Sequence, residues 1–156
     1  MLDSYRDLID GLLETPSALR SLLGDPVPDD APPETVEILR EMTVRETVTL
    51  RRARSVMRKD SMSLVAIEHE PEIEALSSAS SSAPGEAETR ETPEALLTSF
   101  NDNRTELISL LVNLTLRDWE RPVNHEILGE TVLSDEIEDH LTWDEAIVAR
   151  LTSAAA

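Results

Sequence analysis

Four ionisable residues occupy positions where the helical pattern of this sequence otherwise places apolar side chains. Successive side chains on a helix lie about 100° apart, which fixes the face that each one shares. Glu46 lies in the middle of one apolar stripe, and Arg104 lies in the middle of a second. His140 and Asp144, four residues apart, both lie within a third. Burying such groups without partners is costly, so we expect them to pair inside the fold.

Arginine suits the centre of such a cluster because its planar fork can serve two carboxylates. We therefore predict a buried polar network in which Glu46 and Asp144 surround Arg104, with His140 nearby. One interpretation is structural: an ion cluster that fixes the register of the helices. The other is functional: a ligand or metal site at the base of a cleft.

A metal site needs deprotonated nitrogen or oxygen ligands within about 2 Å of one point. His140 and Asp144 could supply two ligands from one helix, and Glu41 or Glu46 could supply a third from another. Zinc, nickel or manganese would suit such a set. In a chain with 32 acidic residues, the same spacing also arises by chance. Both interpretations therefore remain open.

Four helices must position these residues, since apolar side chains recur at steps of three and four. The predicted helices span about 2–23, 33–59, 92–119 and 131–151. Pro16 interrupts the first helix and predicts a kink or break there, with Thr15 capping a fresh turn. Gly24 ends that helix. Thr92 and Pro93 form a typical cap and first residue for the third.

The predicted connections are unequal in length. Residues 60–91 form a long connector whose centre is rich in Ser, Ala and Glu, which predicts flexibility. Residues 121–130 form a shorter loop with Pro122 and Gly129 as breakers. One long crossover among short loops is a known bundle topology. The sequence thus predicts an all-α four-helix bundle that forms a single domain over residues 1–156.

Composition narrows the class of protein further. The 156 residues are 40% hydrophobic and 3% aromatic, which favours one aliphatic helical core. The absence of cysteine excludes disulfides, thiolate metal sites and catalysis by a cysteine thiol. A net charge of −18 repels nucleic acid and anionic membranes. No apolar run approaches the roughly 18 residues of a membrane span, and no basic leader precedes the first helix. We expect a cytoplasmic protein.

The remaining candidate residues have simpler interpretations. The basic residues at 51–59 could form a nucleic-acid patch, but cations also suit a helix C-terminus, and the overall charge disfavours nucleic acid. His69 lies in the long connector, where we expect it to be solvated. His125 lies in the shorter loop, where a turn or capping role is expected.

Four stretches of the chain also resemble, in order and spacing, those of a known family. They are residues 5–16, 37–46, 103–111, and 119–133 running into 139–144. The family is the DinB/YfiT-like group, named for a DNA-damage-inducible protein. The resemblance implies an up-down-down-up four-helix bundle, often dimeric. Some members are thiol-dependent transferases or isomerases, and many are presumed hydrolases.

The resemblance also implies where a metal would bind. Members that look active carry one histidine on the second helix and two, four residues apart, on the fourth. Those positions align with Glu41, Trp143 and Ile147, none of which is histidine, so the resemblance implies a degenerate metal site. An alignment shifted by one turn instead places His140 and Asp144 at the paired positions, with Glu41 completing the set.

Two functional hypotheses follow. The first is a metal-free bundle without a cofactor that acts by binding an unknown small molecule, as a homodimer and in a stress response. The alternative is a divalent-metal-dependent hydrolase or thiol-dependent transferase that uses His140, Asp144 and Glu41 to hold zinc or nickel. Neither hypothesis involves a membrane or nucleic acid.

Overall fold

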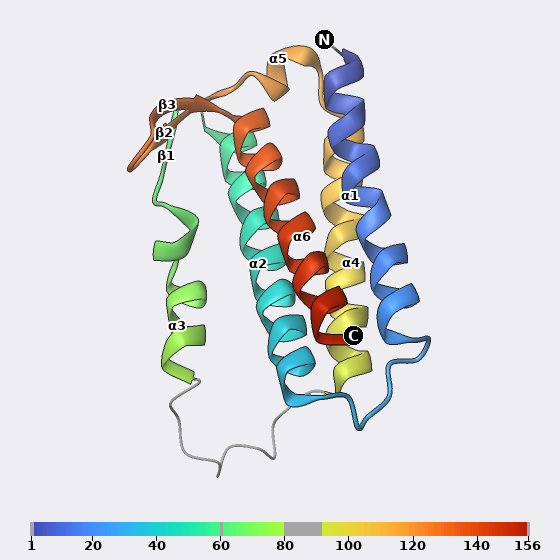
Figure 1. Cartoon of the computed structure of the whole chain (residues 1–156). Coiled ribbons are helices and arrows are strands. Elements are labelled where there is room, and N and C mark those ends of the chain that lie inside the picture. The colour runs from blue at the N-terminus through green and yellow to red at the C-terminus, as the bar shows by residue number, and fades with distance from the viewer. Residues whose placement is uncertain (1, 60, 80–91, 156) are drawn as a thin grey trace.

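The computed structural model describes residues 2–59, 61–79 and 92–155 (Figure 1). These residues form six α-helices, one short 3₁₀ helix and three short strands, joined by turns and loops. In chain order they are α1 (Leu2–Leu23), α2 (Pro33–Arg58), β1 (Met62–Leu64), η1 (Ile67–His69), α3 (Pro71–Ala79), α4 (Pro93–Val112), α5 (Leu116–Trp119), β2 (Pro122–His125), β3 (Gly129–Val132) and α6 (Leu133–Ala155).

The four long helices α1, α2, α4 and α6 form a bundle, which confirms the predicted fold class. Helices α2 and α4 run parallel to each other, and α1 and α6 run in the opposite direction (Figure 1). This is the expected up-down-down-up order. Helix α2 packs mainly against α4, and α1 packs mainly against α6. Because α2 and α4 point the same way, the connection between them must travel back along the bundle. Among the described helices, none combines the length and apolar character that crossing a membrane requires.

Helix α1 runs unbroken through Pro16, so the break that Pro16 suggested in the sequence is wrong. Proline has no N–H and cannot bond to the carbonyl four residues earlier. That carbonyl belongs to Leu12, and Arg104 Nη1 donates to it at 2.8 Å from α4. The orphaned acceptor is thus satisfied from another helix. At the end of α1, Gly24 adopts φ +105°, a conformation that glycine tolerates best.

Helix α4 begins as predicted but ends earlier. Thr92 accepts a hydrogen bond from the Ala95 N–H, which caps the first turn. The helix stops at Val112, and the prediction that it continues to Trp119 is wrong. The reason is a second cap: Thr115 accepts from the Asp118 N–H, and the Asp118 carboxylate accepts from the Thr115 N–H. This reciprocal pair starts the separate helix α5.

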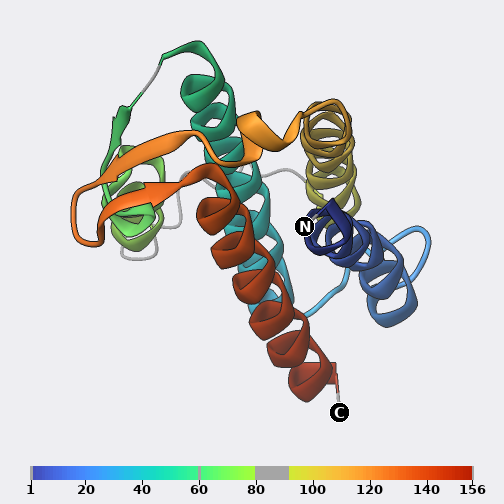
Figure 2. The same ribbon diagram turned by 90° about the horizontal axis from the view of Figure 1, so that it is seen from above.

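Both predicted loops contain regular structure, contrary to expectation. Strand β2 pairs with β3 in antiparallel fashion and with β1 in parallel fashion, so the sheet order is β1-β2-β3. The first part of the predicted connector forms β1, η1 and α3. Most of its centre, which was predicted to be flexible, falls in residues 80–91, outside the described residues. Seen from above, the sheet and α3 lie beside α2 and α6, away from α1 and α4 (Figure 2).

Buried Arg52 fastens this side structure to the bundle. Its guanidinium makes two hydrogen bonds to Glu136 of α6, at 3.1 and 2.8 Å. It also donates to the Val65 carbonyl and to the Glu70 carboxylate, at 2.7 and 2.9 Å. One side chain of α2 thus joins α6 to the segment after β1.

The apolar core is divided into two clusters along the bundle axis. The cluster nearer the sheet includes Leu50, Leu107 and Trp119, and the other includes Leu39 and Phe100. A layer of polar side chains lies between them in sequence on all four long helices. This polar layer therefore lies inside the bundle, between its two apolar clusters, and not at an end of the bundle.

Candidate functional site

The polar layer is built from Thr15 of α1, Glu46 of α2, Arg104 of α4, and His140 and Asp144 of α6. None of these residues is more than 5% exposed to solvent. Each follows from helix periodicity, because each replaces one apolar residue within a stripe that faces the bundle interior.

Arg104 lies at the centre of this layer. Its Nε and Nη2 donate to the two carboxylate oxygens of Glu46, at 2.6 and 2.7 Å. The same Nη2 lies 2.8 Å from Asp144 Oδ2 and 3.3 Å from His140 Nε2. With Nη1 on the Leu12 carbonyl, the guanidinium has partners from the other three long helices.

His140 lies between a carboxylate and a hydroxyl. Its Nε2 is 2.7 Å from Glu46 Oε1, and its Nδ1 is 3.3 Å from the hydroxyl of Thr49. A carboxylate oxygen can only accept, so the Nε2–H of His140 donates a hydrogen bond to Glu46. Thr49 can donate to Nδ1 or accept from it, so its hydroxyl can pair with this nitrogen whether or not it carries a proton.

Asp144 is only partly satisfied. Its Oδ2 accepts a hydrogen bond from Thr15 at 3.0 Å and faces Arg104. Its Oδ1 is buried and has no hydrogen-bond partner among the described residues. A buried carboxylate oxygen without a donor is uncommon, and it marks a position where a cation or proton could be accommodated.

Electrostatics hold the layer in its charged form. Burial raises the pKa of Glu46, but attraction to His140 and hydrogen bonds from Arg104 outweigh burial and bring it to about 2. Burial likewise lowers the pKa of Arg104, but its bonds to Glu46 leave it above the ordinary value. Glu46 and Arg104 are therefore an ion pair at neutral pH.

The structure brings together the four residues that the sequence grouped as a network: Glu46, Arg104, His140 and Asp144. It does not place Glu41 with them. Glu41 lies nearer the surface of α2, where a carboxylate oxygen is 3.7 Å from Arg150. The carboxylate from α2 that accompanies His140 and Asp144 is thus Glu46, and not the residue that the resemblance suggested.

The other two positions implied by the resemblance are not donors to this cluster. Trp143 is half-buried and stacks under the guanidinium of Arg45, 4.5 Å from the ring centroid. Ile147 is buried in the apolar cluster farther from the sheet.

Sequence reasoning missed three supports of the network. Thr15 was expected to cap a helical turn, but its hydroxyl binds Asp144. Thr49 was also overlooked, although it lies three residues after Glu46 and so on the same face. The Leu12 carbonyl carried a signal in the sequence, because Pro16 four residues later cannot bond to it.

The donor set fits a divalent cation in its chemistry. Glu46, His140 and Asp144 each offer a ligand atom, and these atoms lie within 4.8 Å of one another. An imidazole nitrogen with two carboxylates is a normal set for zinc, manganese or iron. The obstacle is Arg104, whose Nη2 contacts Glu46 Oε1, His140 Nε2 and Asp144 Oδ2. A bound metal would therefore compete with this guanidinium for Glu46 and Asp144.

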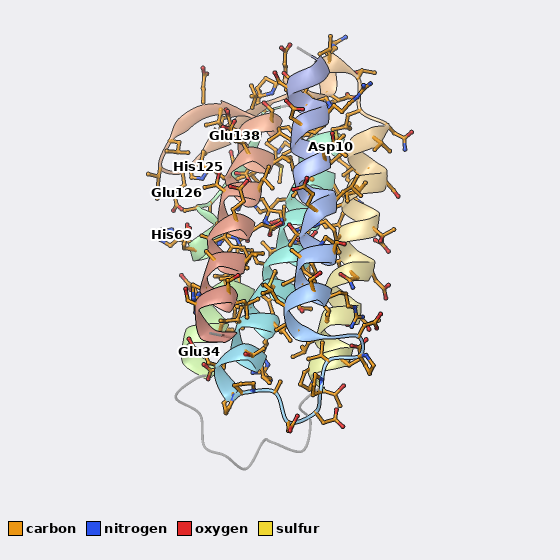
Figure 3. All side chains as sticks on the ribbon, turned by 45° about the vertical axis from the view of Figure 1, so that its right-hand side comes forward. Asp10, Glu34, His69, His125, Glu126 and Glu138 are labelled. Carbon is orange, nitrogen blue, oxygen red and sulfur yellow. The ribbon has the colours of Figure 1, made fainter. Side chains whose placement is uncertain are left out.

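The other histidines lie outside the layer, near the sheet (Figure 3). His69 is half exposed and pairs with Glu126 at 2.8 Å. His125 Nδ1 accepts from the backbone N–H groups of Ile127 and Leu128, each at 3.1 Å. The predicted turn role of His125 is confirmed, and neither histidine reaches the candidate site.

The basic cluster of α2 is largely neutralised by acids. Arg51 pairs with Glu70 and Glu72, and Arg54 pairs with Glu106 of α4 at 2.8 Å. With Arg52 bound to Glu70 and Glu136, three of the five basic residues at 51–59 have acidic partners, which weakens their attraction for phosphate groups.

Comparison with known proteins supports the fold. No family model matches the sequence, and no curated protein matches it significantly. Among solved structures, the chain is similar to YfiT from Bacillus subtilis, described as a probable metal-dependent hydrolase with an unusual four-helix bundle topology. The two are 15% identical, with a TM-score of 0.75 over 98% of this chain and 86% of YfiT. A likeness at this identity establishes the shared fold alone.

Proposed function

We propose that this protein is a hydrolase that depends on a divalent metal held by Glu46, His140 and Asp144. The observation that carries the proposal is the convergence of these three donors, from α2 and α6, inside the bundle. The unpartnered Oδ1 of Asp144 supports it, because that oxygen could ligate a cation without losing any bond. The arrangement also has one donor on the second long helix and two, four residues apart, on the last. That is the pattern implied by the family resemblance.

A metal in this position would polarise a substrate carbonyl or lower the pKa of a bound water. The protein's own groups would orient the donors. Thr49 holds the far nitrogen of His140, and Thr15 holds one oxygen of Asp144. Such outer contacts fix the direction of a ligand and raise its basicity.

A second candidate is a metal-free bundle that acts by binding. It is favoured by one observation: the guanidinium of Arg104 already neutralises Glu46 and Asp144. In this case the polar layer would be a structural device, and any ligand would bind beside it.

Metal content separates the two candidates. Protein purified without chelator should contain zinc, nickel or manganese near one ion per chain, and His140→Ala should lose it. Glu46→Gln should lose the metal as well, whereas Glu41→Gln on the same helix should keep it. His69→Ala is the matched control for histidine.

The competition with Arg104 gives a second measurement. Arg104→Leu should bind zinc more tightly than the wild type in equilibrium dialysis, because the competing cation is gone. Ester hydrolysis that rises with added metal would support the enzymatic part. Metal-free protein that takes up no zinc in either form would defeat the proposal and leave the binding candidate.

From the family resemblance we also propose a homodimer that acts in a cytoplasmic stress response. Sedimentation of the purified chain would test the dimer. A single species with the mass of one chain at all concentrations would exclude it.

A further inference from the structure

A cavity of about 440 Å³ lies on the sheet side of the polar layer. It is bounded by α2, α6, the segment after β1 and the turn between β2 and β3, and it is partly open to solvent. His140 lines this cavity and also contacts Glu46 of the polar layer. Whatever occupies the cavity therefore lies next to the proposed metal donors.

Arg45 is a buried cation in this cavity, and the part of the chain that the structure describes places no carboxylate against it. Only 8% of the residue is exposed, and its Nε has no hydrogen-bond partner. Among the described residues, no carboxylate lies within ion-pair distance of its guanidinium. Arg52 and Arg104 are buried to a similar extent, and each is paired with two carboxylates.

Burial of Arg45 carries an electrostatic cost. Burial lowers the pKa of Arg45, and the more distant acids, led by Glu68, only partly oppose that effect. A buried guanidinium lacking a hydrogen-bonded partner is destabilising. An anion entering the cavity would relieve this penalty.

Trp143 holds the guanidinium in place. The carbon at the centre of the Arg45 fork lies 4.5 Å from the Trp143 ring centroid, which is a cation–π contact. The Trp143 ring also lies nearly parallel to that of His140, with the centroids 6.4 Å apart. Arg45, Trp143 and His140 therefore form one wall, with a fork suited to a carboxylate.

Apolar side chains and acids make up other parts of the lining. Ile127 and Leu128 are 65% and 60% exposed at the turn between β2 and β3, and Ile67 also lines the cavity. Glu68 and Asp139 also line the cavity, and both would repel a multiply charged anion. Arg52 and Glu136 also line the cavity, but they are hydrogen-bonded to each other, so the lining fits a ligand with one negative charge and an apolar body.

We infer that this cavity binds a small organic monocarboxylate, with its carboxylate on Arg45 and its apolar body between Trp143 and the turn at Ile127 and Leu128. The ligand would then lie beside His140. That such a molecule is a substrate rests on the hydrolase function proposed above. Its binding does not, and can be measured in protein freed of metal.

Titration followed by ¹⁵N nuclear magnetic resonance tests the inference. The probes are hexanoate, its neutral analogue hexanamide, and inorganic phosphate, added to chelator-treated protein. The indole N–H of Trp143 reports on the cavity. That of Trp119, stacked on Tyr5 in the core, is an internal control.

Hexanoate should shift the Trp143 resonance in a saturable way and leave Trp119 unchanged. Hexanamide and phosphate should each bind about tenfold more weakly or worse. Arg45→Met keeps the apolar stem but removes the charge, and should weaken hexanoate binding to the same extent. Arg58→Met, an exposed change on the same helix, should have no effect.

Three results would overturn the inference: equal affinity for hexanoate and hexanamide, tighter binding of phosphate than of hexanoate, or unchanged affinity in a folded Arg45→Met variant. Since every titration is free of metal, failure of the metal site leaves these results unaffected. Conversely, a metal-binding protein that ignores hexanoate would refute only this inference.

Discussion

At the scale of single residues, the buried guanidinium of Arg104 balances two carboxylates. Glu46 and Asp144 are almost completely buried, and each is within 2.8 Å of an Arg104 nitrogen. Removing one member of a buried ion cluster strands the others in a medium that cannot solvate them. In metal-free protein, Arg104 is therefore required for stability.

We predict that Arg104→Leu lowers the free energy of unfolding by about 2–4 kcal/mol in metal-free protein. Leucine retains apolar volume but leaves Glu46 and Asp144 without a cation. Denaturant unfolding followed by circular dichroism measures the change. Arg117→Leu, at an exposed position, should cost little, and an equal loss in both variants would contradict the prediction.

The charge of Glu46 should make stability depend on acidity. Its pKa is lower in the folded chain, about 2, than the ordinary value of 4.5, so the unfolded chain binds the proton more tightly. The stability it contributes is complete above pH 4.5 and disappears as the pH falls toward 2.

We therefore expect the unfolding free energy of the wild type to fall with acid over this window. Glu46→Gln should be less stable at neutral pH and should show a flatter decline. Unfolding curves recorded from neutral pH down to about pH 2 check this. Parallel profiles for the two proteins would mean that Glu46 does not carry the effect.

At the scale of elements, α1 takes part in the site through its irregularity. Pro16 leaves the Leu12 carbonyl free for Arg104, and Thr15 turns its hydroxyl to Asp144. A helix with neither residue would offer only apolar side chains to this layer. Thr15 and Pro16 thus let α1 satisfy polar groups of the network: Thr15 supplies a donor, and Pro16 leaves a carbonyl free as an acceptor.

We predict that Thr15→Val destabilises the fold by about 1–2 kcal/mol, because Asp144 loses its hydroxyl donor and valine cannot replace it. Thr15→Ser keeps the hydroxyl and should recover most of the loss. Thermal unfolding of the three proteins decides the matter. A serine variant as unstable as the valine variant would show that packing, and not the hydrogen bond, is responsible.

The helices and the grouping of polar residues could be predicted because both depend on local periodicity. A period of 3.6 residues fixes which side chains share a face, and the apolar stripes of Leu and Ile identify the inner face. The helical period of the sequence is therefore sufficient to group Arg104 with Glu46, His140 and Asp144.

What could not be predicted depends on partners distant in the chain. Strand β1 is three residues long and pairs with β2 some sixty residues later, so neither shows a strand pattern of its own. The hydrogen bond from Thr15 to Asp144 spans 129 residues. The restart at Thr115 is different, because Thr115 and Asp118 have the spacing of a capping box and the signal was present in the sequence.

At the scale of the whole molecule, charge imbalance opposes compaction. The chain has 32 acidic and 14 basic residues, and much of the negative charge lies on the surface. Self-repulsion of this kind weakens the folded state, and salt screens it.

We expect the melting temperature to rise when potassium chloride increases from about 0.1 M to about 1 M, where the screening length falls from about 10 Å to about 3 Å. Near pH 4, where many carboxylates are protonated, the same addition should have a smaller effect. A melting temperature that falls with salt would show that the ion pairs of Arg51, Arg54 and similar residues outweigh the repulsion.

The polar layer also constrains the order in which the molecule can assemble. Arg104 has partners on α1, α2 and α6. A folding intermediate in which one of these helices is not packed would therefore leave a buried donor or acceptor without a hydrogen-bond partner. Partly folded states of the bundle are thus destabilised relative to the native state, in which these hydrogen bonds are formed. We therefore expect unfolding to be a single concerted transition, with identical midpoints when followed at Trp119 and at Trp143.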